Sequence, residues 1–249
     1  MSREAAERIL QHLDSVQRLR AARAGDAALC ERLQALKTYQ AQRFRLSYAD
    51  LLADGRHGPA ARFFLHELYG PQEFGARDAQ FARIVPALVR LFSTELVDTV
   101  ALLGELHALS EQLDDAGARW LDTPRLDAAG YVRLWQAVGS PPQRERQITL
   151  TLQIGAAMDR YTRSRLLRSS LRLMRGPAQA AGLGALQQFL EAGFDAFGAM
   201  GGAAGFLQTV GQRERALATA LYSHEAITWA TNPSTPASAP RPAALAQLP

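Results

Sequence analysis

The sequence contains very little cysteine or lysine and no long hydrophobic run. Its single cysteine, Cys30, excludes an intramolecular disulfide and any zinc or iron–sulfur site held by several cysteines. All but one of the 28 Lys and Arg residues are arginine, yet the formal net charge is only +4, well short of a typical nucleic-acid-binding protein. No stretch offers the roughly eighteen apolar residues of a membrane-spanning helix, and the charged N-terminus lacks the apolar segment of a secretory signal. We therefore expect a cytoplasmic protein for which neither nucleic acid nor membrane is the favoured partner. Peripheral membrane association through the glycine-rich residues 176–212 is the last-ranked alternative.

Hydrophobic periodicity predicts an all-α protein. The chain has 249 residues, 47% of them hydrophobic, which is enough for one large domain. Apolar residues recur at three- and four-residue spacing in segments bounded by Gly, Pro and helix-capping Ser or Asp. The strand-like alternation of residues 148–154 has no partner strand elsewhere, so we assign it to a long helix over residues 144–175. The sequence predicts a single-domain bundle of eight or nine helices over residues 1–230.

The two ends of the chain are expected to differ from the rest. Residues 1–54 contain two amphipathic helices joined by a short turn at Gly25, which predicts an antiparallel helical hairpin followed by a bundle over residues 59–230. The apolar stripe of this hairpin is a candidate interface for a homodimer. Residues 231–249 carry five prolines and one charged residue, so we expect a flexible, disordered tail there.

An aromatic motif, Phe-Phe-Leu-His-Glu-Leu-Tyr, occupies Phe63–Tyr69. It resembles a group of bacterial proteins named for an FFLEELY motif, although His66 stands where the family name has Glu. The similarity continues at Gly70-Pro71, Arg77-Asp78, Tyr161-Thr-Arg163 and Leu173-Met-Arg-Gly-Pro177. The resemblance implies a relationship but no activity, because that family has none assigned. His66 and Glu67 are either a ligand or acid–base pair or, as we favour, partners of neighbouring Arg or backbone groups.

Residues 93–115 place three polar side chains along one edge of a predicted helix. The apolar face of this helix carries Leu96, Val100, Leu103 and Leu106, and its edge carries His107, Glu111 and Asp114. An imidazole beside two carboxylates could hold a metal or relay protons, so these three residues, with His66 and Glu67, are the candidate catalytic residues of a helical-bundle enzyme. The chain lacks the Glu-x-x-His pairs of di-metal bundles, and an ion-pair network with nearby arginines fits equally well. We expect no metal and leave any cofactor open.

Four arginines share one edge of the predicted helix over residues 144–175. At 100° per residue they fall within about 80° of arc, with Tyr161 among them: Arg165, Arg168, Arg172 and Arg175. Such a row attracts phosphate, carboxylate or an acidic protein face, unless acids on neighbouring helices match its charge. The leading hypothesis is a non-enzymatic binding or scaffold protein that presents this arginine stripe to an anionic small molecule or an acidic protein surface. The alternative is the bundle enzyme.

Overall fold

The computed structural model describes residues 2–68, 75–231 and 241–249. Within these ranges it contains thirteen α-helices, a π-helix, a 3₁₀ helix and no strand, which confirms the all-α single-domain fold. The predicted number of eight or nine helices is too low, because several predicted segments are divided into shorter helices. The elements are α1 (Ser2–Arg23), α2 (Ala27–Ser47), α3 (Ala49–Ala53), α4 (Gly58–Phe63), the π-helix (Phe64–Leu68), α5 (Gly75–Leu91), α6 (Thr94–Trp120), α7 (Ala128–Ala137), α8 (Pro141–Thr162), α9 (Arg165–Leu173), α10 (Arg175–Ala180), α11 (Gly184–Ala199), α12 (Ala204–Leu221), α13 (His224–Thr231) and the 3₁₀ helix (Ala243–Leu245). None of the described helices combines the length and apolar character that crossing a bilayer requires.

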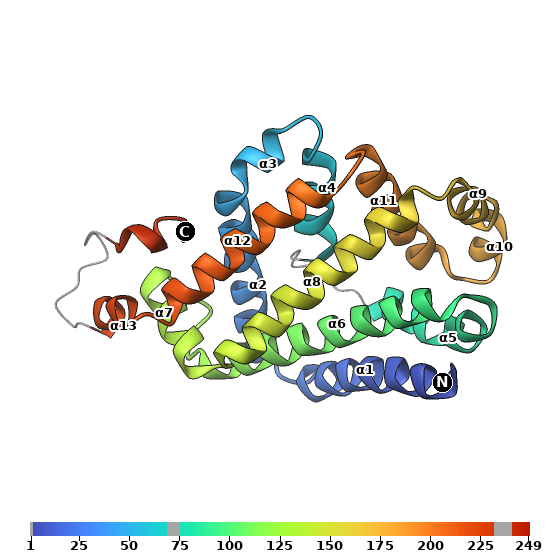
Figure 1. Cartoon of the computed structure of the whole chain (residues 1–249). Helices are drawn as coiled ribbons and strands as arrows, with labels where there is room; N and C mark the ends of the chain where they lie inside the picture. Colours follow the sequence, from blue (N-terminus) through green and yellow to red (C-terminus); the bar gives the residue numbers. More distant parts are fainter. Residues whose placement is uncertain (1, 69–74, 232–240) are drawn as a thin grey trace.

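The long helix α6 runs through much of the molecule (Figure 1). Helix α1 lies along it, α2 and α8 cross it, and α12 packs against α8. Helices α5, α9, α10 and α11 gather at one end of the molecule, whereas α7, α13 and the C-terminal residues lie at the other. The two ends of α6 therefore lie near different sets of helices.

Helices α1 and α2 depart from the expected antiparallel hairpin. The chain turns at residues 24–26 and Asp26 caps the first turn of α2, as the sequence indicates. However, α2 runs steeply across the direction of α1 (Figure 1). Helix α1 packs along α5 and α6 instead, where Ile9, Leu13 and Val16 are buried. The apolar stripe on which the predicted dimer rested is thus covered by the same chain.

The segment predicted as one helix over residues 144–175 is helical but divided. Residues 148–154 lie within α8, so their assignment to a helix is confirmed. Helix α8 ends at Thr162, and the Ser164 hydroxyl then accepts a hydrogen bond from the Leu167 backbone N–H (3.3 Å). Because Ser164 has an extended backbone and acts as a new N-cap, α9 starts as a separate helix.

The last nine residues pack against the helices, which differs from the expected flexible tail. Residues 232–240 of that tail lie outside the described part of the chain. Leu245 and Leu248 are buried in a cluster with side chains of α2, α7, α12 and α13. The Ser47 hydroxyl also donates a hydrogen bond to Gln247 Oε1 (2.8 Å). The two leucines lie three residues apart. A turn in which the Leu248 backbone N–H donates to the Leu245 carbonyl (3.0 Å) brings them to the same side.

Replacing Leu245 with Ala should lower the free energy of unfolding by about 2–3 kcal/mol, because it removes a fully buried side chain and leaves a cavity. Urea denaturation measures this change. The exposed neighbour Ala246 provides the control, since Ala246→Ser should change stability by less than about 0.5 kcal/mol. Equal stability of L245A and the wild type would show that this segment does not dock in solution.

Candidate functional site

An internal cavity of about 560 Å³ is the candidate functional site. Helix α6 follows its length, because the lining residues Leu96 and Asp114 are separated by roughly 27 Å of helix at 1.5 Å per residue. The apolar stripe of α6 that the sequence assigns to a helix face lines this cavity: Leu96, Val100, Leu103 and Leu106. The smaller residues of α6, such as Ala101 and Ala108, form its deeply buried face. The large side chains of α6 therefore surround a space instead of filling a core.

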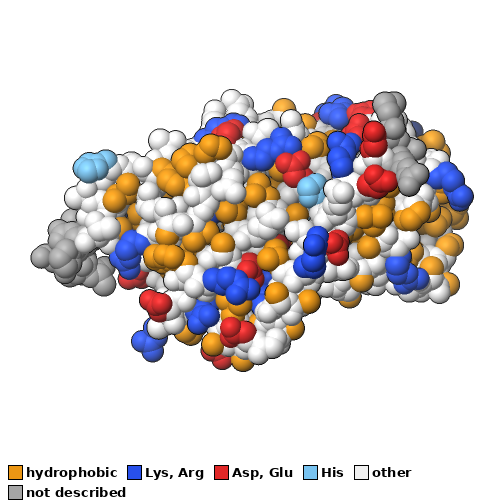
Figure 2. All heavy atoms as spheres, turned by 90° about the horizontal axis from the view of Figure 1, so that it is seen from below, with side chains coloured by type: hydrophobic (Ala, Val, Ile, Leu, Met, Phe, Trp, Pro, Cys, Tyr) orange, Lys and Arg blue, Asp and Glu red, His pale blue; other side chains and the backbone are white. Residues whose placement is uncertain are grey.

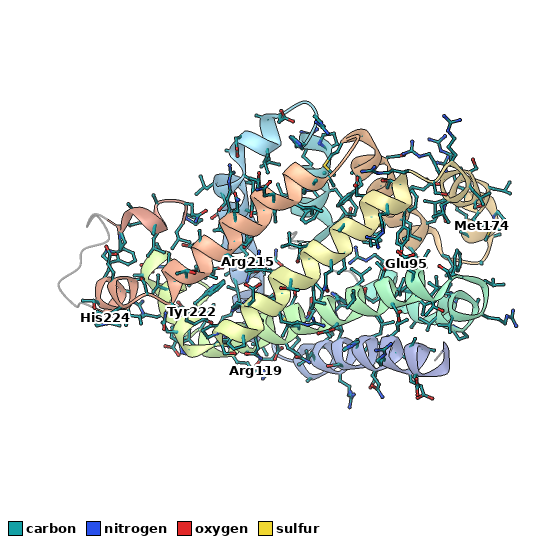
Figure 3. The ribbon with its side chains drawn as sticks, in the orientation of Figure 1. Glu95, Arg119, Met174, Arg215, Tyr222 and His224 are labelled. Carbon is teal, nitrogen blue, oxygen red and sulfur yellow. The ribbon has the colours of Figure 1, made fainter. Side chains whose placement is uncertain are left out.

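One end of the cavity is apolar and reaches the molecular surface. Side chains of α5, α9, α10 and α11 line it: Phe81, Ile84, Leu88, Leu167, Leu171, Ala178, Leu186, Phe189, Leu190 and Phe194. Three further lining residues are also solvent-exposed, Leu91 at 70%, Met174 at 51% and Phe92 at 48%. Figure 3 shows Met174 at the outer end of the molecule, beside α9 and α10. We call this end the mouth of the cavity.

The opposite end is closed and carries polar and charged groups. They come from α2, α6, α7, α8 and α12: Lys37, Gln40, Arg43, Glu111, Asp114, Tyr131, Trp135, Arg144, Gln147 and Glu214. Five of them are buried on relative exposure: Arg43, Glu111, Tyr131, Trp135 and Arg144. Arg43 pairs with Glu214, with Nη1 2.5 Å from Oε1. The cavity thus joins an apolar mouth to a buried polar end.

Arg144 is a buried guanidinium with no carboxylate partner among the described residues. Its relative exposure is 7%, and its Cζ lies 4.1 Å from the centroid of the Trp135 ring in a cation–π contact. Nη1 donates a hydrogen bond to Gln147 Oε1 (3.1 Å), while Nε has no hydrogen-bond partner in the described part of the chain. Burying a charge in this way is costly unless an anion and further hydrogen bonds accompany it. Arg144 is therefore poised to bind an anionic group.

Asp114 faces the same end of the cavity. Its Oδ1 accepts a hydrogen bond from Gln40 Nε2 (2.9 Å). Burial raises the pKa of the Asp114 carboxyl, and the charge of Lys37 together with the Gln40 hydrogen bond opposes this only in part. Once protonated, this carboxyl becomes a hydrogen-bond donor. The polar end can thus offer both a guanidinium and a carboxylic acid to one ligand.

Glu111 joins three helices beside the cavity. Its Oε2 accepts from Arg23 Nη2 of α1 (2.9 Å), and its Oε1 accepts from Lys37 Nζ of α2 (2.8 Å). Burial alone would raise the pKa of Glu111, but Lys37, Arg23 and Arg20 outweigh that effect and lower the pKa to about 2. The carboxylate therefore stays ionised and holds α1 and α2 against α6.

His107 contacts Asp78 instead of the two carboxylates predicted to act with it. Its Nε2 lies 2.8 Å from Asp78 Oδ2, which also accepts from Arg20 Nη1 (2.7 Å). His107, Glu111 and Asp114 all line the cavity, as their shared edge of the helix predicts. Within residues 2–68, 75–231 and 241–249, no group of three or more His, Cys, Asp or Glu side chains could hold a metal ion. His107 is held by Asp78, and Glu111 is held by the arginines of α1, so both side chains have structural partners.

The aromatic motif continues α4 into the π-helix Phe64–Leu68. Phe64 is buried, whereas His66 is exposed and absent from the cavity lining. Glu67 does line the cavity, and its Oε2 accepts from Arg77 Nη1 (3.4 Å). The structure thus brings Glu67, but not His66, to the wall that carries His107.

The predicted arginine stripe is divided among three helices. Tyr161 lies at the end of α8, where its hydroxyl is 2.9 Å from Thr99 Oγ1. Arg175 begins α10 and forms an ion pair with Glu191, with Nη2 2.7 Å from Oε2. The three remaining arginines lie together on α9 without an ion pair among the described residues: Arg165, Arg168 and Arg172. Their role in ligand binding stays a prediction.

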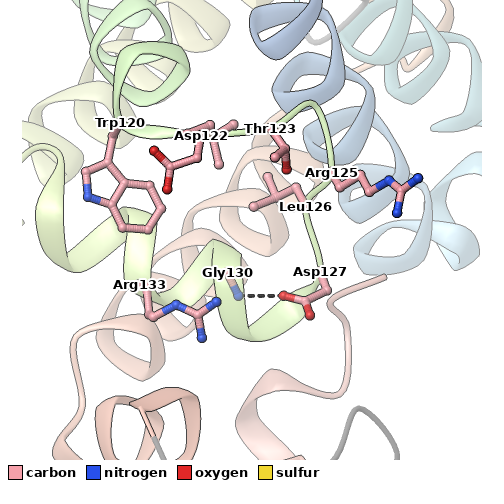
Figure 4. Close-up of a pocket in the computed structure, with 9 residues that line it drawn as sticks. Trp120, Asp122, Thr123, Arg125, Leu126, Asp127, Gly130 and Arg133 are labelled. Atoms are coloured by element: carbon pink, nitrogen blue, oxygen red, sulfur yellow. Dashed lines mark hydrogen bonds between the residues drawn. The ribbon is translucent and has the colours of Figure 1, made fainter. Parts of the chain in front are cut away.

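A second hollow, of about 730 Å³, lies at the loop between α6 and α7 (Figure 4). Two of its polar side chains already serve the fold. Asp127 Oδ1 accepts from the Gly130 backbone N–H (2.7 Å) and caps α7, as the dashed line in Figure 4 shows. Arg133 Nη1 donates to the Ala230 carbonyl (2.6 Å). Asp122 and Arg125 also line this hollow, but neither is buried, unlike Arg144.

Sequence reasoning missed several residues of the site, with Lys37, Asp78 and Arg144 among them. Lys37 is distinctive only as the single lysine of the chain. Asp78 occurs in the sequence analysis only as part of the resemblance, which gives it no role, because its partners Arg20 and His107 are far away in the sequence. Trp135 and Gln147 are close to Arg144 in the sequence, but their spacing does not indicate a cation–π contact or a cavity.

Replacing Glu111 with Gln should lower the free energy of unfolding by about 3 kcal/mol, because it leaves Arg23 and Lys37 without their buried counter-charge. Glu105→Gln is the matched control, since the Glu105–Arg146 pair is more exposed and should contribute less than about 1 kcal/mol. Urea denaturation of both variants measures the two effects.

The same comparison in acid tests the lowered pKa of Glu111. The stabilisation is fully present above the ordinary value of 4.5 and is lost as the pH falls towards about 2. The difference in stability between the wild type and E111Q should shrink over that range. A constant difference would contradict the ion-pair network as its cause.

One comparison with known proteins gives a match. A family model described as Domain of unknown function (DUF8198) matches residues 19–227, which is most of the chain. No curated protein and no solved structure matches it.

Proposed function

The chain belongs to the DUF8198 family of unknown function, and we propose that it is a binding protein for an amphipathic molecule with a long apolar chain and a carboxylate head group. The observation that carries the proposal is the buried guanidinium of Arg144, which has no ion pair within the described residues and lies at the polar end of the cavity. The binding role inferred from the sequence is kept, but the anion site moves from α9 to Arg144. The resemblance to FFLEELY-motif proteins stays a prediction.

The charges at the polar end favour a carboxylate. Lys37 and Arg43 already have carboxylate partners in Glu111 and Glu214, whereas Arg144 has none within the described ranges. A carboxylate can take up two guanidinium N–H groups at once, so it would give Arg144 both a counter-charge and a partner for its free Nε–H. Protonated Asp114 would add a third hydrogen bond to the same group.

The dimensions of the cavity favour a long chain. The roughly 27 Å of α6 along the cavity exceeds the length of a lipid tail, which is about 15 Å when taken as half of a bilayer's hydrocarbon core. The walls between Arg144 and the mouth carry mostly Leu, Ile, Val and Phe. A chain buried along them would gain about 0.8 kcal/mol for each methylene removed from water.

Hexadecanoate should bind to the purified protein, as measured by isothermal titration calorimetry. The variant Arg144→Met should bind it about tenfold to a hundredfold more weakly, because a hydrogen-bonded charge contributes about 1.5–3 kcal/mol. Arg146→Met on the same helix is the control, because Arg146 is exposed, pairs with Glu105 and lies outside the cavity lining. R146M should bind like the wild type.

Two further ligands separate the contributions of head group and chain. Hexadecanol lacks the charge and should bind weakly to wild type and R144M alike, whereas octanoate has the charge but buries less apolar surface. Circular dichroism of R144M checks that the helices are retained. Wild-type protein that fails to bind hexadecanoate, or a folded R144M that binds it equally well, would overturn the proposal.

The affinity for hexadecanoate should rise as the pH falls through the raised pKa of Asp114. An anionic ligand beside Asp114 favours the protonated form of this carboxyl, so binding takes up a proton. Asp114→Asn should bind more tightly than the wild type at high pH and should lose this part of the pH dependence. Comparing the two proteins at each pH cancels the ligand's own titration. Parallel pH profiles would show that Asp114 does not contact the head group.

A further inference from the structure

Helix α9 exposes an unusual amount of apolar surface next to the mouth of the cavity. Leu166 is 76% exposed and Leu173 is 79% exposed. Met174, directly after α9, and Leu91 and Phe92, at the end of α5, are exposed at the same end of the molecule. These five are most of the large exposed hydrophobic residues in the described part of the chain. We call them the apolar rim.

The positions along α9 explain why these leucines remain uncovered. At 100° per residue, Leu166 and Leu173 lie within about 20° of each other on the outer surface. Leu167 and Leu171 occupy the inner side and line the cavity. The apolar face of α9 is therefore wider than the part that the fold covers.

Arginines flank the outer leucines of α9. Arg165 and Arg172 lie within about 20° of each other and roughly 100° from the leucine pair. Both are exposed, and neither forms an ion pair among the described residues. Figure 2 shows the molecule from below, and on that face acidic and basic side chains lie close together. The rim thus combines exposed apolar groups with two exposed arginines that form no ion pair within the described residues.

We propose that α9 and the apolar rim form a docking surface for an anionic lipid membrane. Leu166, Leu173 and Met174 would enter the boundary between head groups and acyl chains, while Arg165 and Arg172 contact anionic head groups. This combination of apolar side chains with flanking cations matches a lipid surface of negative charge. An acidic protein would need the arginines but would leave the leucines exposed, and a second copy would bring like charges together.

The proposal stands independently of the ligand proposed for the cavity, because it rests on exposed residues that Arg144 does not contact. It also gives the mouth a function. A membrane docked on the rim would place the hydrocarbon of a lipid directly outside the cavity. An amphipathic molecule could then pass between membrane and cavity without crossing water.

Co-sedimentation with vesicles tests the docking surface. The full-length protein should bind phosphatidylcholine vesicles that contain about one quarter phosphatidylserine, and should bind pure phosphatidylcholine at least about tenfold more weakly. High salt should weaken the binding. The double variants Leu166→Gln/Leu173→Gln and Arg165→Gln/Arg172→Gln should each lose about tenfold or more in affinity for the anionic vesicles.

Matched controls come from exposed residues far from the rim. Leu46→Gln on α2 replaces another exposed leucine, and Arg45→Gln/Arg125→Gln removes two exposed arginines that have no ion pair among the described residues. Both controls should bind anionic vesicles like the wild type. A loss of affinity equal to that of the rim variants would mean non-specific attraction and would overturn the proposal.

Two other outcomes would also overturn it. One is absence of wild-type binding to the anionic vesicles. The other is a wild-type dimer, measured by sedimentation equilibrium, that the leucine variant converts to monomer, because the rim would then bind a second copy. Hexadecanoate titration of the leucine variant distinguishes this proposal from the previous one, since binding inside the cavity should persist there even when membrane docking is lost.

Discussion

The Glu111 carboxylate joins α1, α2 and α6, and the closed end of the cavity depends on it. Arg23 of α1 and Lys37 of α2 both bind this one carboxylate, so neither helix can shift without leaving a buried charge unpaired. Lys37 also lines the cavity. The ion-pair network therefore fixes one wall of the polar end before any ligand is considered. At the mouth, α9, α10 and α11 are also joined by polar contacts, because Arg175 pairs with Glu191 and Gln187 donates to both Glu191 and the Leu171 carbonyl.

The cavity follows from the two different apolar faces of α6. Small residues on one face let α1 pack against α6, as at Ala101, which is buried in one cluster with Ile9 and Leu13. Leucine and valine on the other face line the cavity together with side chains of α5, α8 and α11. An apolar cavity lowers stability because its walls lose packing partners. A fold that retains one beside an unpaired arginine gives up stability at two adjoining places, which is typical of a binding site.

The sequence predicts the helices better than it predicts what they contact. Asp26, Ser93 and Asp127 each cap a helix at a boundary that the sequence predicts, because caps act through neighbouring residues. Ser164 also caps a helix, but it lies inside the segment predicted as one long helix, so that boundary was missed. The crossing of α1 and α2 depends instead on contacts between distant helices. The leucines of α6 illustrate the same limit, because periodicity identifies an apolar face but not whether a side chain or a cavity lies opposite. The sequence left open an ion-pair network of Glu111 with nearby arginines, but it did not identify Arg20 and Arg23 as those arginines.

The positions of Arg144 and Asp114 constrain how a carboxylate could reach the closed end. Under the proposed function the head group enters from the mouth and passes the apolar walls before it meets Arg144. Carrying a charge through such a region is costly, whereas a neutral carboxylic acid passes more easily. The acid must then lose its proton to form the ion pair, and Asp114 lies at the same end with a raised pKa. Its carboxylate can accept that proton, and the resulting acid can donate a hydrogen bond to the bound carboxylate. A buried carboxyl that weakens the site while it is ionised thus becomes part of the site once the ligand has delivered its proton.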